Sequence, residues 1–235
     1  YSSTQRQQMA REAHGVSGTV WHVAYNAAET MGNDALSWVT ADLTAGVGVK
    51  TDVEAASAGD LIQIGAGTFA LGDNTIAQPS GTVVRGMGRD VTTIISTHTT
   101  AIAWRLSSKC ELRDCTIDTS ATIAAMAVGA SIYSTVLANA VLRNVKLVGD
   151  KDCLYLGSMF GACTVSAYDC EFSAKYDSVA SFGGDNTIHL HNCSINTLGP
   201  SGDAVAASDG VWCNVGKVWL WGCNVNSQDG NAGYR

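Results

Sequence analysis

The stretch ELRDCTI (residues 111–117) carries an acidic residue, Asp114, that interrupts an alternation of apolar and polar side chains. The same interruption recurs downstream, and each copy reads apolar, variable, Asn/Asp/Gly, Cys/Val, polar, apolar. The five copies are LRDCTI (112–117), LRNVKL (142–147), AYDCEF (167–172), LHNCSI (190–195) and LWGCNV (220–225). Their fourth residues, 115, 145, 170, 193 and 223, are separated by 30, 25, 23 and 30 positions. Repetition at such a period is typical of a solenoid.

The interrupting residue has a physical role. Asn, Asp and Gly enter the left-handed helical region most readily, and one such residue turns the chain sharply. Alternation then resumes with the two faces reset, so that Leu112, Cys115 and Ile117 can all point inward across a corner. Five such corners predict an all-β fold, a parallel β-helix in which each coil lies about 4.8 Å above the last.

Composition limits the function classes. The chain has 235 residues, 46% hydrophobic and 15% charged, which is typical of a globular protein. The net charge of −7 and the pI near 5.0 argue against general nucleic-acid binding, which requires a basic face.

The cysteines favour a buried ladder of free thiols. Four of the eight occupy the same repeat position, with neither CxxC pairs nor metal-ligand spacing. Free Cys is a small and often buried hydrophobe, so we expect a ladder in the core and synthesis in a reducing compartment. No metal and no cofactor are expected. The eight are Cys110, Cys115, Cys153, Cys163, Cys170, Cys193, Cys213 and Cys223.

The N-terminal part divides at residues 18 and 96. Residues 1–18 contain a polar helix at 4–13 and are expected to form a tether, and the start at Tyr1 suggests a segment of a longer protein. Residues 19–96 form a capping segment and the first coils, with a helix at 47–59 that covers the open end of the solenoid. Residues 97–235 are expected to form further coils of the β-helix, which continue beyond this segment. The uncharged run 119–142 is long enough for a membrane span, but its Ser, Thr, Ala and Gly content and the corner that follows argue against insertion.

The run SAGDLIQIGAGTFALGDNTIAQPSGTVVRGMGRDVTTII (57–95) resembles the N-terminal coils of right-handed parallel β-helix proteins of the pectate-lyase-like superfamily. That superfamily includes polysaccharide-acting enzymes and phage tailspikes. The resemblance extends through the corners to Val225, and it implies a right-handed coil. Many viral members are trimeric, which implies a homotrimer here. Since the architecture hosts lyases, hydrolases, adhesins and inert virion parts, the resemblance predicts fold better than function.

Two columns of outward side chains are predicted on the wall that precedes each corner. Aromatic and basic residues stacked there suit sugar rings, and they suit a neighbouring subunit equally well. One column is Arg113, Arg143, Tyr168, His191 and Trp221, and the other is Glu111, Val141, Ser166, His189 and Trp219.

The pair His189 and His191 also invites a metal interpretation. The neighbouring column positions supply no carboxylate or thiol as further ligands, so a zinc site is not expected.

Glycoside hydrolysis requires two carboxylates close together. The outward column after the corner reads Thr116, Lys146, Glu171, Ser194 and Asn224 and has a single acid. The candidates for acid and base are therefore loop aspartates, Asp152, Asp177 and Asp203, for which solvated turn formation is the favoured interpretation. Asp150 and Asp229 lie in the same loops.

Three functions remain open. The first is a non-enzymatic virion protein, such as a tailspike, fibre or capsid decoration protein, that binds host glycan and contacts other virion proteins through its N-terminal segment. The second is a polysaccharide depolymerase, a hydrolase or lyase that uses the three aspartates. The third is an adhesin on a bacterial surface. The expected location is accordingly the virion surface, or else the extracellular space or the bacterial cell surface.

Overall fold

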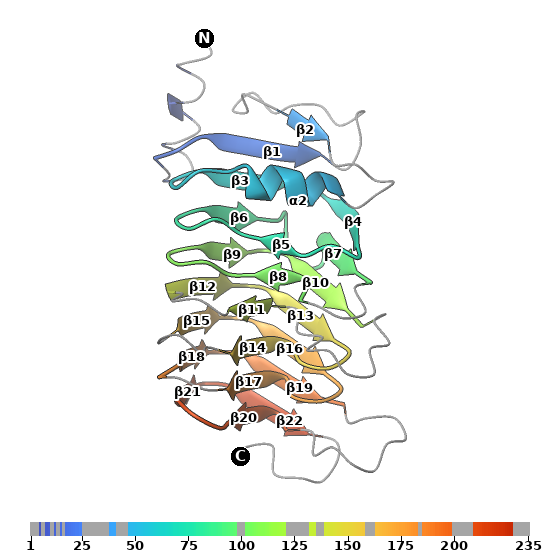
Figure 1. Cartoon of the computed structure of the whole chain (residues 1–235), viewed down its shortest axis with the longest axis vertical. Coiled ribbons are helices and arrows are strands. Elements are labelled where there is room, and N and C mark those ends of the chain that lie inside the picture. The colour runs from blue at the N-terminus through green and yellow to red at the C-terminus, as the bar shows by residue number, and fades with distance from the viewer. Residues whose placement is uncertain are drawn as a thin grey trace.

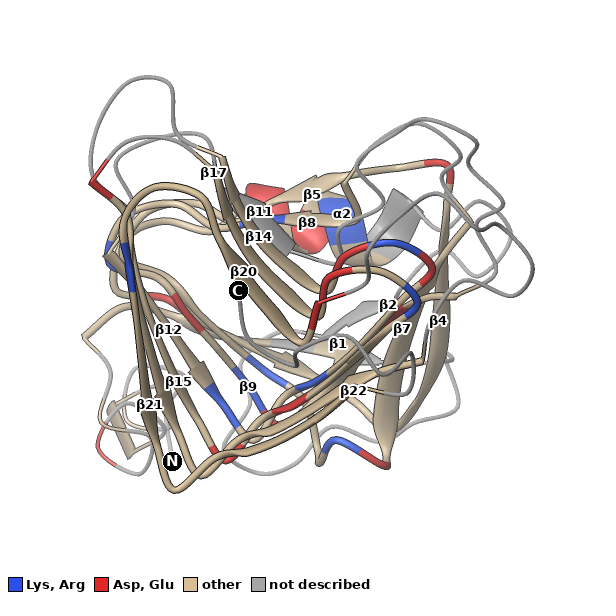
Figure 2. Ribbon diagram, turned by 90° about the horizontal axis from the view of Figure 1, so that it is seen from below, with Lys and Arg blue, Asp and Glu red and all other residues tan. Residues whose placement is uncertain are grey.

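The computed structural model describes residues 5, 8–9, 12, 15, 17–24, 38–40, 47–97, 102–120, 132–134, 139–157, 163–182, 185–198 and 209–227. In this part, three parallel sheets wind round one core, and Figure 1 shows the coils stacked along a single axis from the N-terminus to the C-terminus. The chain is a right-handed parallel β-helix, as predicted. Viewed along the axis, the sheets form the walls of the solenoid (Figure 2).

Each full coil contributes one strand to each sheet in the order A, B, C. Sheet A runs β2-β1-β3-β6-β9-β12-β15-β18-β21, sheet B runs β22-β19-β16-β13-β10-β7-β4, and sheet C runs β20-β17-β14-β11-β8-β5. The strands of sheet A are β1 (Val20–Ala24), β2 (Trp38–Thr40), β3 (Leu61–Ile64), β6 (Val83–Arg85), β9 (Glu111–Arg113), β12 (Asn139–Arg143), β15 (Thr164–Tyr168), β18 (Thr187–His191) and β21 (Lys217–Trp221). Those of sheet B are β4 (Gly67–Gly72), β7 (Thr92–Ser96), β10 (Thr116–Thr119), β13 (Lys146–Gly149), β16 (Glu171–Ala174), β19 (Ser194–Thr197) and β22 (Asn224–Ser227). Those of sheet C are β5 (Ile76–Ala77), β8 (Trp104–Arg105), β11 (Ile132–Ser134), β14 (Leu154–Gly157), β17 (Val179–Phe182) and β20 (Val211–Cys213).

The predicted corners lie between sheets A and B, and all five are left-handed. The backbone φ angles are 56° at Asp114, 49° at Asn144, 56° at Asp169, 54° at Asn192 and 64° at Gly222. Side chains bond along the corners, since Asn144 Nδ2 donates to Asp114 Oδ1 at 2.9 Å. The backbone N–H of each of the first four corners also donates to the next coil, for example Asn144 to the carbonyl of Tyr168 at 2.9 Å. These bonds hold successive coils in register.

The residue after each corner points into the core, which confirms the predicted ladder. Cys115, Val145, Cys170 and Cys193 are all buried, while Cys223 in the last described coil is half-buried. All eight cysteines are free thiols. Contact with Cys170, together with burial, raises the pKa of the Cys193 thiol. Burial likewise raises the pKa of the Cys115 thiol, so both of these side chains remain neutral in the core.

Helix α2 (Val47–Glu54) lies against β5, the edge strand of sheet C. The carboxylate of Glu54 accepts a hydrogen bond from the outward N–H of Ala77 in β5 at 2.8 Å, so the helix satisfies an edge group that would otherwise be open to pairing. The helix predicted at 47–59 ends earlier, at Glu54. The cause is Asp60, whose Oδ2 accepts the N–H of Ser57 at 2.9 Å and folds residues 57–60 into a turn.

Two other expectations fall largely outside the described residues. These are the helix at 4–13 and the uncharged run at 119–142. In the described part of the chain, no helix is long and apolar enough to cross a membrane.

The corner geometry gives a first testable prediction. Asp169→Val should lower the free energy of unfolding by roughly 1–2 kcal/mol, because a β-branched residue is strained in the left-handed region. Asp169→Gly is the matched control and should cost less, since Gly222 already occupies the same position in another coil. Urea denaturation measures both. Equal stability of the two variants would show that this corner is not strained.

Candidate functional site

The two predicted outward columns lie side by side on sheet A. Strand pairing places Arg113, Arg143, Tyr168, His191 and Trp221 in one register row across five coils, and Arg85 extends it by one coil. The second row is Glu111, Val141, Ser166, His189 and Trp219. The sequence therefore predicted which residues of this wall are neighbours in space.

The first row forms a continuous stack, which we call the sheet A stack and which consists of Arg143, Tyr168, His191 and Trp221. The guanidinium carbon of Arg143 lies 4.4 Å from the Tyr168 ring centroid. Tyr168 and His191 are stacked at 4.8 Å with 10° between their planes, and His191 and Trp221 at 4.4 Å with 8°. The contacts combine a cation–π pair with offset ring stacking.

The second row supplies two more rings at the C-terminal end of the wall. His189 stacks on Trp221 at 5.5 Å, and Trp219 lies 6.1 Å from Trp221 with 14° between the two planes. Trp219 and Trp221 are 49% and 43% exposed. Two large apolar side chains are thus presented to solvent next to each other.

The opposite end of the wall is a charge cluster. Arg85 Nε lies 3.2 Å from Asp114 Oδ2, and the Glu111 carboxylate lies 3.7 Å from Arg113 and 3.3 Å from Arg143. Every arginine of the row therefore has an acidic neighbour. The pairs are partly exposed, so they fix side-chain positions more than they stabilise the fold.

The two histidines are part of the ring stack. His191 is sandwiched between Tyr168 and Trp221, and His189 lies against Trp221. Across the described ranges, no group of three or more His, Cys, Asp or Glu side chains is placed to hold a metal ion.

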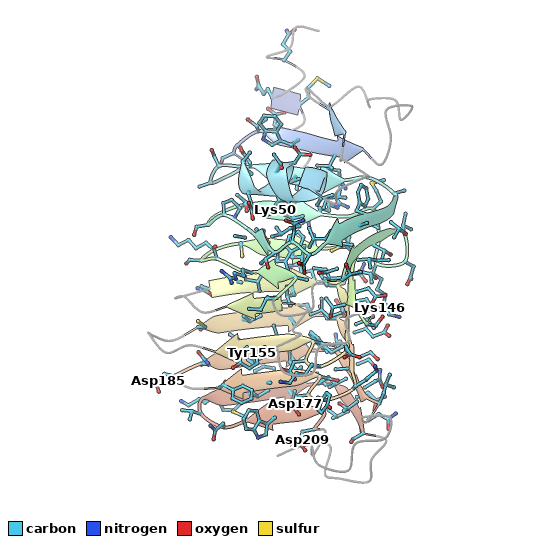
Figure 3. All side chains as sticks on the ribbon, turned by 45° about the vertical axis from the view of Figure 1, so that its right-hand side comes forward. Lys50, Lys146, Tyr155, Asp177, Asp185 and Asp209 are labelled. Carbon is cyan, nitrogen blue, oxygen red and sulfur yellow. The ribbon has the colours of Figure 1, made fainter. Side chains whose placement is uncertain are left out.

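A second candidate site is the turn between sheets B and C, where three aspartates stand in one column. Backbone pairing aligns Asp152, Asp177 and Asp209, because Cys153 N donates to Asp177 O at 3.3 Å and Ser178 N donates to Asp209 O at 3.2 Å. The N–H of Asp209 also donates to Asp177 Oδ1 at 3.0 Å. The three residues therefore occupy successive coils, one strand spacing of about 4.8 Å apart. Figure 3 shows Asp177 and Asp209 following each other down the axis in the C-terminal half.

The aspartate column is strongly desolvated. Asp152 and Asp209 are each 3% exposed. Burial raises the pKa of Asp152 to about 7, the nearby Asp177 carboxylate adds to the rise, and Lys151 opposes it. Burial likewise raises the pKa of Asp177 to about 6, partly offset by the hydrogen bond from the Asp209 N–H. Carboxyl groups that stay protonated near neutral pH are the kind that general acid catalysis uses.

The sequence analysis predicted two of the three members of this column, Asp152 and Asp177. Asp203 lies outside the described residues, as does Asp229, and the third member is Asp209. Asp150 is instead paired with Lys175. Asp152, Asp177 and Asp209 each lie two residues before the first residue of a sheet C strand, a spacing that becomes visible only when the strand starts are known.

Sheet C also carries an aromatic cluster that the sequence analysis did not find, composed of Tyr155, Phe182 and Trp212. The Tyr155 and Phe182 centroids are 4.8 Å apart at 35°, and Phe182 and Trp212 meet edge to face at 3.7 Å. The cluster covers the small residue Ala180, which pairs with both Tyr155 and Trp212. All three rings are half-buried.

Comparisons with known proteins bear on the fold. No protein-family model and no curated protein sequence matches the chain. Among solved structures, pectin methylesterase PemA from Erwinia chrysanthemi superimposes with a TM-score of 0.60 at 15% identity, over 91% of this chain and 68% of the esterase. The tailspike protein gp49 from Acinetobacter baumannii bacteriophage Fri1, a capsular polysaccharide depolymerase, superimposes with a TM-score of 0.58 at 14% identity. The match covers 92% of this chain and 42% of the tailspike. Geobacillus virus E2 ORF18 superimposes with a TM-score of 0.51 at 10% identity, over 75% of this chain and 44% of the viral protein.

These similarities and the parallel sheets define the class. The chain has the right-handed parallel β-helix fold that the esterase and the tailspike also have. It spans less than half of each of the two viral proteins. At these identities the similarity establishes the fold alone, and function must be argued from the side chains of sheets A and C.

Proposed function

We propose that the chain is a polysaccharide-binding β-helix of a virion surface protein, of the tailspike type. The observation that carries the proposal is the half-exposed indole pair at the end of the sheet A stack. Exposed, rigidly held aromatic rings offer a large apolar surface at a low entropic cost, which suits the C–H faces of sugars. A tailspike and a pectin methylesterase, both named for acting on or modifying polysaccharides, share the fold.

The proposal includes an assembly. The chain forms a homotrimer, and its N-terminal residues 1–18 attach to other virion proteins. Residues 19–96 form the cap and the first coils, and residues 97–235 form the remaining coils. Within this assembly, the sheet A positions Arg113, Arg143, Tyr168, His189, His191, Trp219 and Trp221 are available for host glycan or for a neighbouring subunit.

A second candidate function is depolymerisation, and the aspartate column favours it. Asp152 and Asp177 stand one coil apart, and the pKa of Asp152 is raised to about 7, as the pKa of a glycosidase's general acid is. Against it, Asp152 is almost completely buried, and the Asp177 carboxylate accepts a backbone hydrogen bond from the next coil. These contacts favour a structural role for the aspartate column over a catalytic one.

One experiment separates the two functions. The protein is incubated with capsular polysaccharide from the host bacterium, and bound protein and released reducing ends are both measured. We expect binding without release, and an Asp177→Asn variant that binds as the parent does. Binding by neither the parent nor the variant would contradict the proposal. Release that Asp177→Asn abolishes would favour the depolymerase.

A further inference from the structure

Arginines occupy one outward row of sheet A in three successive coils. Strand pairing places Arg85 in β6, Arg113 in β9 and Arg143 in β12 next to one another. The acidic partners of this group are Glu111 and Asp114. Three positive charges against two negative ones leave these five side chains with one positive charge, whereas the whole chain carries −7. A negatively charged ligand is therefore attracted to this part of an otherwise acidic molecule.

Arg143 is the most exposed of the three arginines. Its side chain is 50% exposed, against 39% for Arg85 and 24% for Arg113. Two contacts hold its guanidinium, since Nε lies 3.3 Å from Glu111 Oε1 and Cζ lies 4.4 Å from the centroid of the Tyr168 ring. Within the described ranges, no residue accepts a hydrogen bond from its two terminal nitrogens. The guanidinium is thus fixed at one edge and one face, and its terminal N–H groups remain for a ligand.

This arrangement suits a carboxylate. The guanidinium is a planar fork whose N–H groups match the two oxygens of a carboxylate, and such bidentate pairs are stronger than neutral hydrogen bonds. Glu111 and Tyr168 already restrict the rotamers of Arg143, so less side-chain entropy is lost when a ligand binds. A lysine would bring the same charge without the planar fork.

The surroundings of Arg143 fit the rest of a sugar unit. Val141 and Ser166 are neighbours in the second outward row, beside Arg143 and Tyr168, and both are half-buried. The hydroxyl of Ser166 can donate and accept, and Val141 offers methyl groups to the C–H bonds of a ring. Strands β9 and β18 flank β12 and β15 in sheet A, so described coils border the site on both sides. The patch combines a charge, a hydroxyl and an apolar surface within two coils.

We propose, building on the glycan-binding function above, that Arg143 binds the carboxylate of an acidic sugar unit. Arg143 contacts the ligand, with Ser166 and Val141 beside it. Tyr168 and Glu111 are positioning residues, because they act by holding the guanidinium in place. The ligand class is accordingly a polysaccharide that contains carboxylated sugars.

Affinity electrophoresis of the full chain tests this assignment. The gels contain hyaluronan or polygalacturonate, and matched gels contain the same two polymers after chemical reduction of their carboxyl groups to alcohols. We expect at least one acidic polymer to retard the protein and its reduced form to retard it far less. Arg143→Gln should weaken binding by about tenfold or more, since arginine is frequent among hot-spot residues. Arg143→Lys keeps the charge and should recover only part of this loss.

Two further comparisons separate direct contact from positioning and from general charge. Tyr168→Ala should weaken binding a few-fold and Tyr168→Phe should restore it, because a phenyl ring can support the guanidinium as well. Arg105→Gln removes the same charge from an exposed position of sheet C and should bind as the parent does.

The assignment is overturned if the reduced polymers are bound as tightly as the acidic ones, if Arg105→Gln weakens binding as much as Arg143→Gln does, or if Tyr168→Phe binds as weakly as Tyr168→Ala. It is also overturned if Arg143→Gln lowers the oligomeric state in sedimentation velocity, because Arg143 would then contact a neighbouring subunit. Binding of host capsule that Arg143→Gln does not weaken would overturn the assignment and leave the proposed function intact. Absence of binding to the acidic polymers, their reduced forms and host capsule alike would overturn the proposed function itself.

Discussion

Cys170→Asp is expected to unfold the chain at 25 °C, or to lower its free energy of unfolding by on the order of 3–5 kcal/mol. Cys170 is 2% exposed and stands in the ladder beside Cys193. A carboxylate there would lie among apolar side chains with no cation to pair with it in the ladder, and burying such a charge is among the most costly single changes. Circular dichroism during thermal and urea denaturation measures the effect.

The chain itself supplies the matched control for this variant. Val145 occupies the same position one coil earlier, so Cys170→Val should fold and remain within about 1 kcal/mol of the parent. If Cys170→Asp melted at the parent's temperature, residue 170 would not face the interior. The corner assignment would then fail for the whole ladder.

Asp152→Asn is expected to stabilise the protein at pH 8 and to remove much of its pH dependence. The pKa of Asp152 is about 7 in the folded protein, against 3.8 for an ordinary aspartate. A raised carboxyl pKa means that the folded state prefers the protonated form. The stability that it contributes is therefore complete below about pH 4 and is lost as the pH rises through 7.

For a nearly buried group this loss is on the order of 2–4 kcal/mol between pH 4 and pH 8. Asn at position 152 stays neutral and can still accept the backbone hydrogen bond from Asp177. The parent should thus become less stable from pH 4 to pH 8, while the variant should change less, with Asp177 and Asp52, whose pKa values burial raises to about 6, as the remaining contributors. Asp185→Asn, at an exposed position, is the control and should follow the parent. A parent whose stability rises over this range would contradict the desolvated column.

The corners could be predicted because their signal is local. Asp114, Asn144, Asp169, Asn192 and Gly222 are the residue types that tolerate a positive φ, and the flanking apolar residues fix the inward face. Since strands β9, β12, β15, β18 and β21 of sheet A each end at a corner, the outward rows follow by counting back from it. The wall from Arg113 to Trp221 was therefore available from the sequence.

The positions of residues on sheet C could not be predicted by counting from the corners. Its strands follow turns of different length, since β13 ends at Gly149 and β14 begins at Leu154, whereas β19 ends at Thr197 and β20 begins at Val211. Counting forward from the corner therefore selected Asp203 in place of Asp209. The same variation concealed the cluster of Tyr155, Phe182 and Trp212, whose members share no fixed distance from a corner.

The sequence also could not predict what the faces of the aromatic rings contact. Alternation places Tyr168, His191 and Trp221 on one wall, but whether their faces meet each other or meet solvent depends on side-chain rotamers in a packed column. The distances of 4.8 and 4.4 Å show that the faces meet each other. The faces of His191 are therefore covered by its neighbours in the stack.

The most direct test of this account is an experimental density map of the protein at a resolution that shows side chains. We expect three parallel sheets, positive φ at residues 114, 144, 169, 192 and 222, and a column in which the Tyr168, His191 and Trp221 rings lie 4.4 to 4.8 Å apart. Antiparallel sheets or a helical bundle at residues 110–225 would contradict it. So would a map in which those three rings point away from one another.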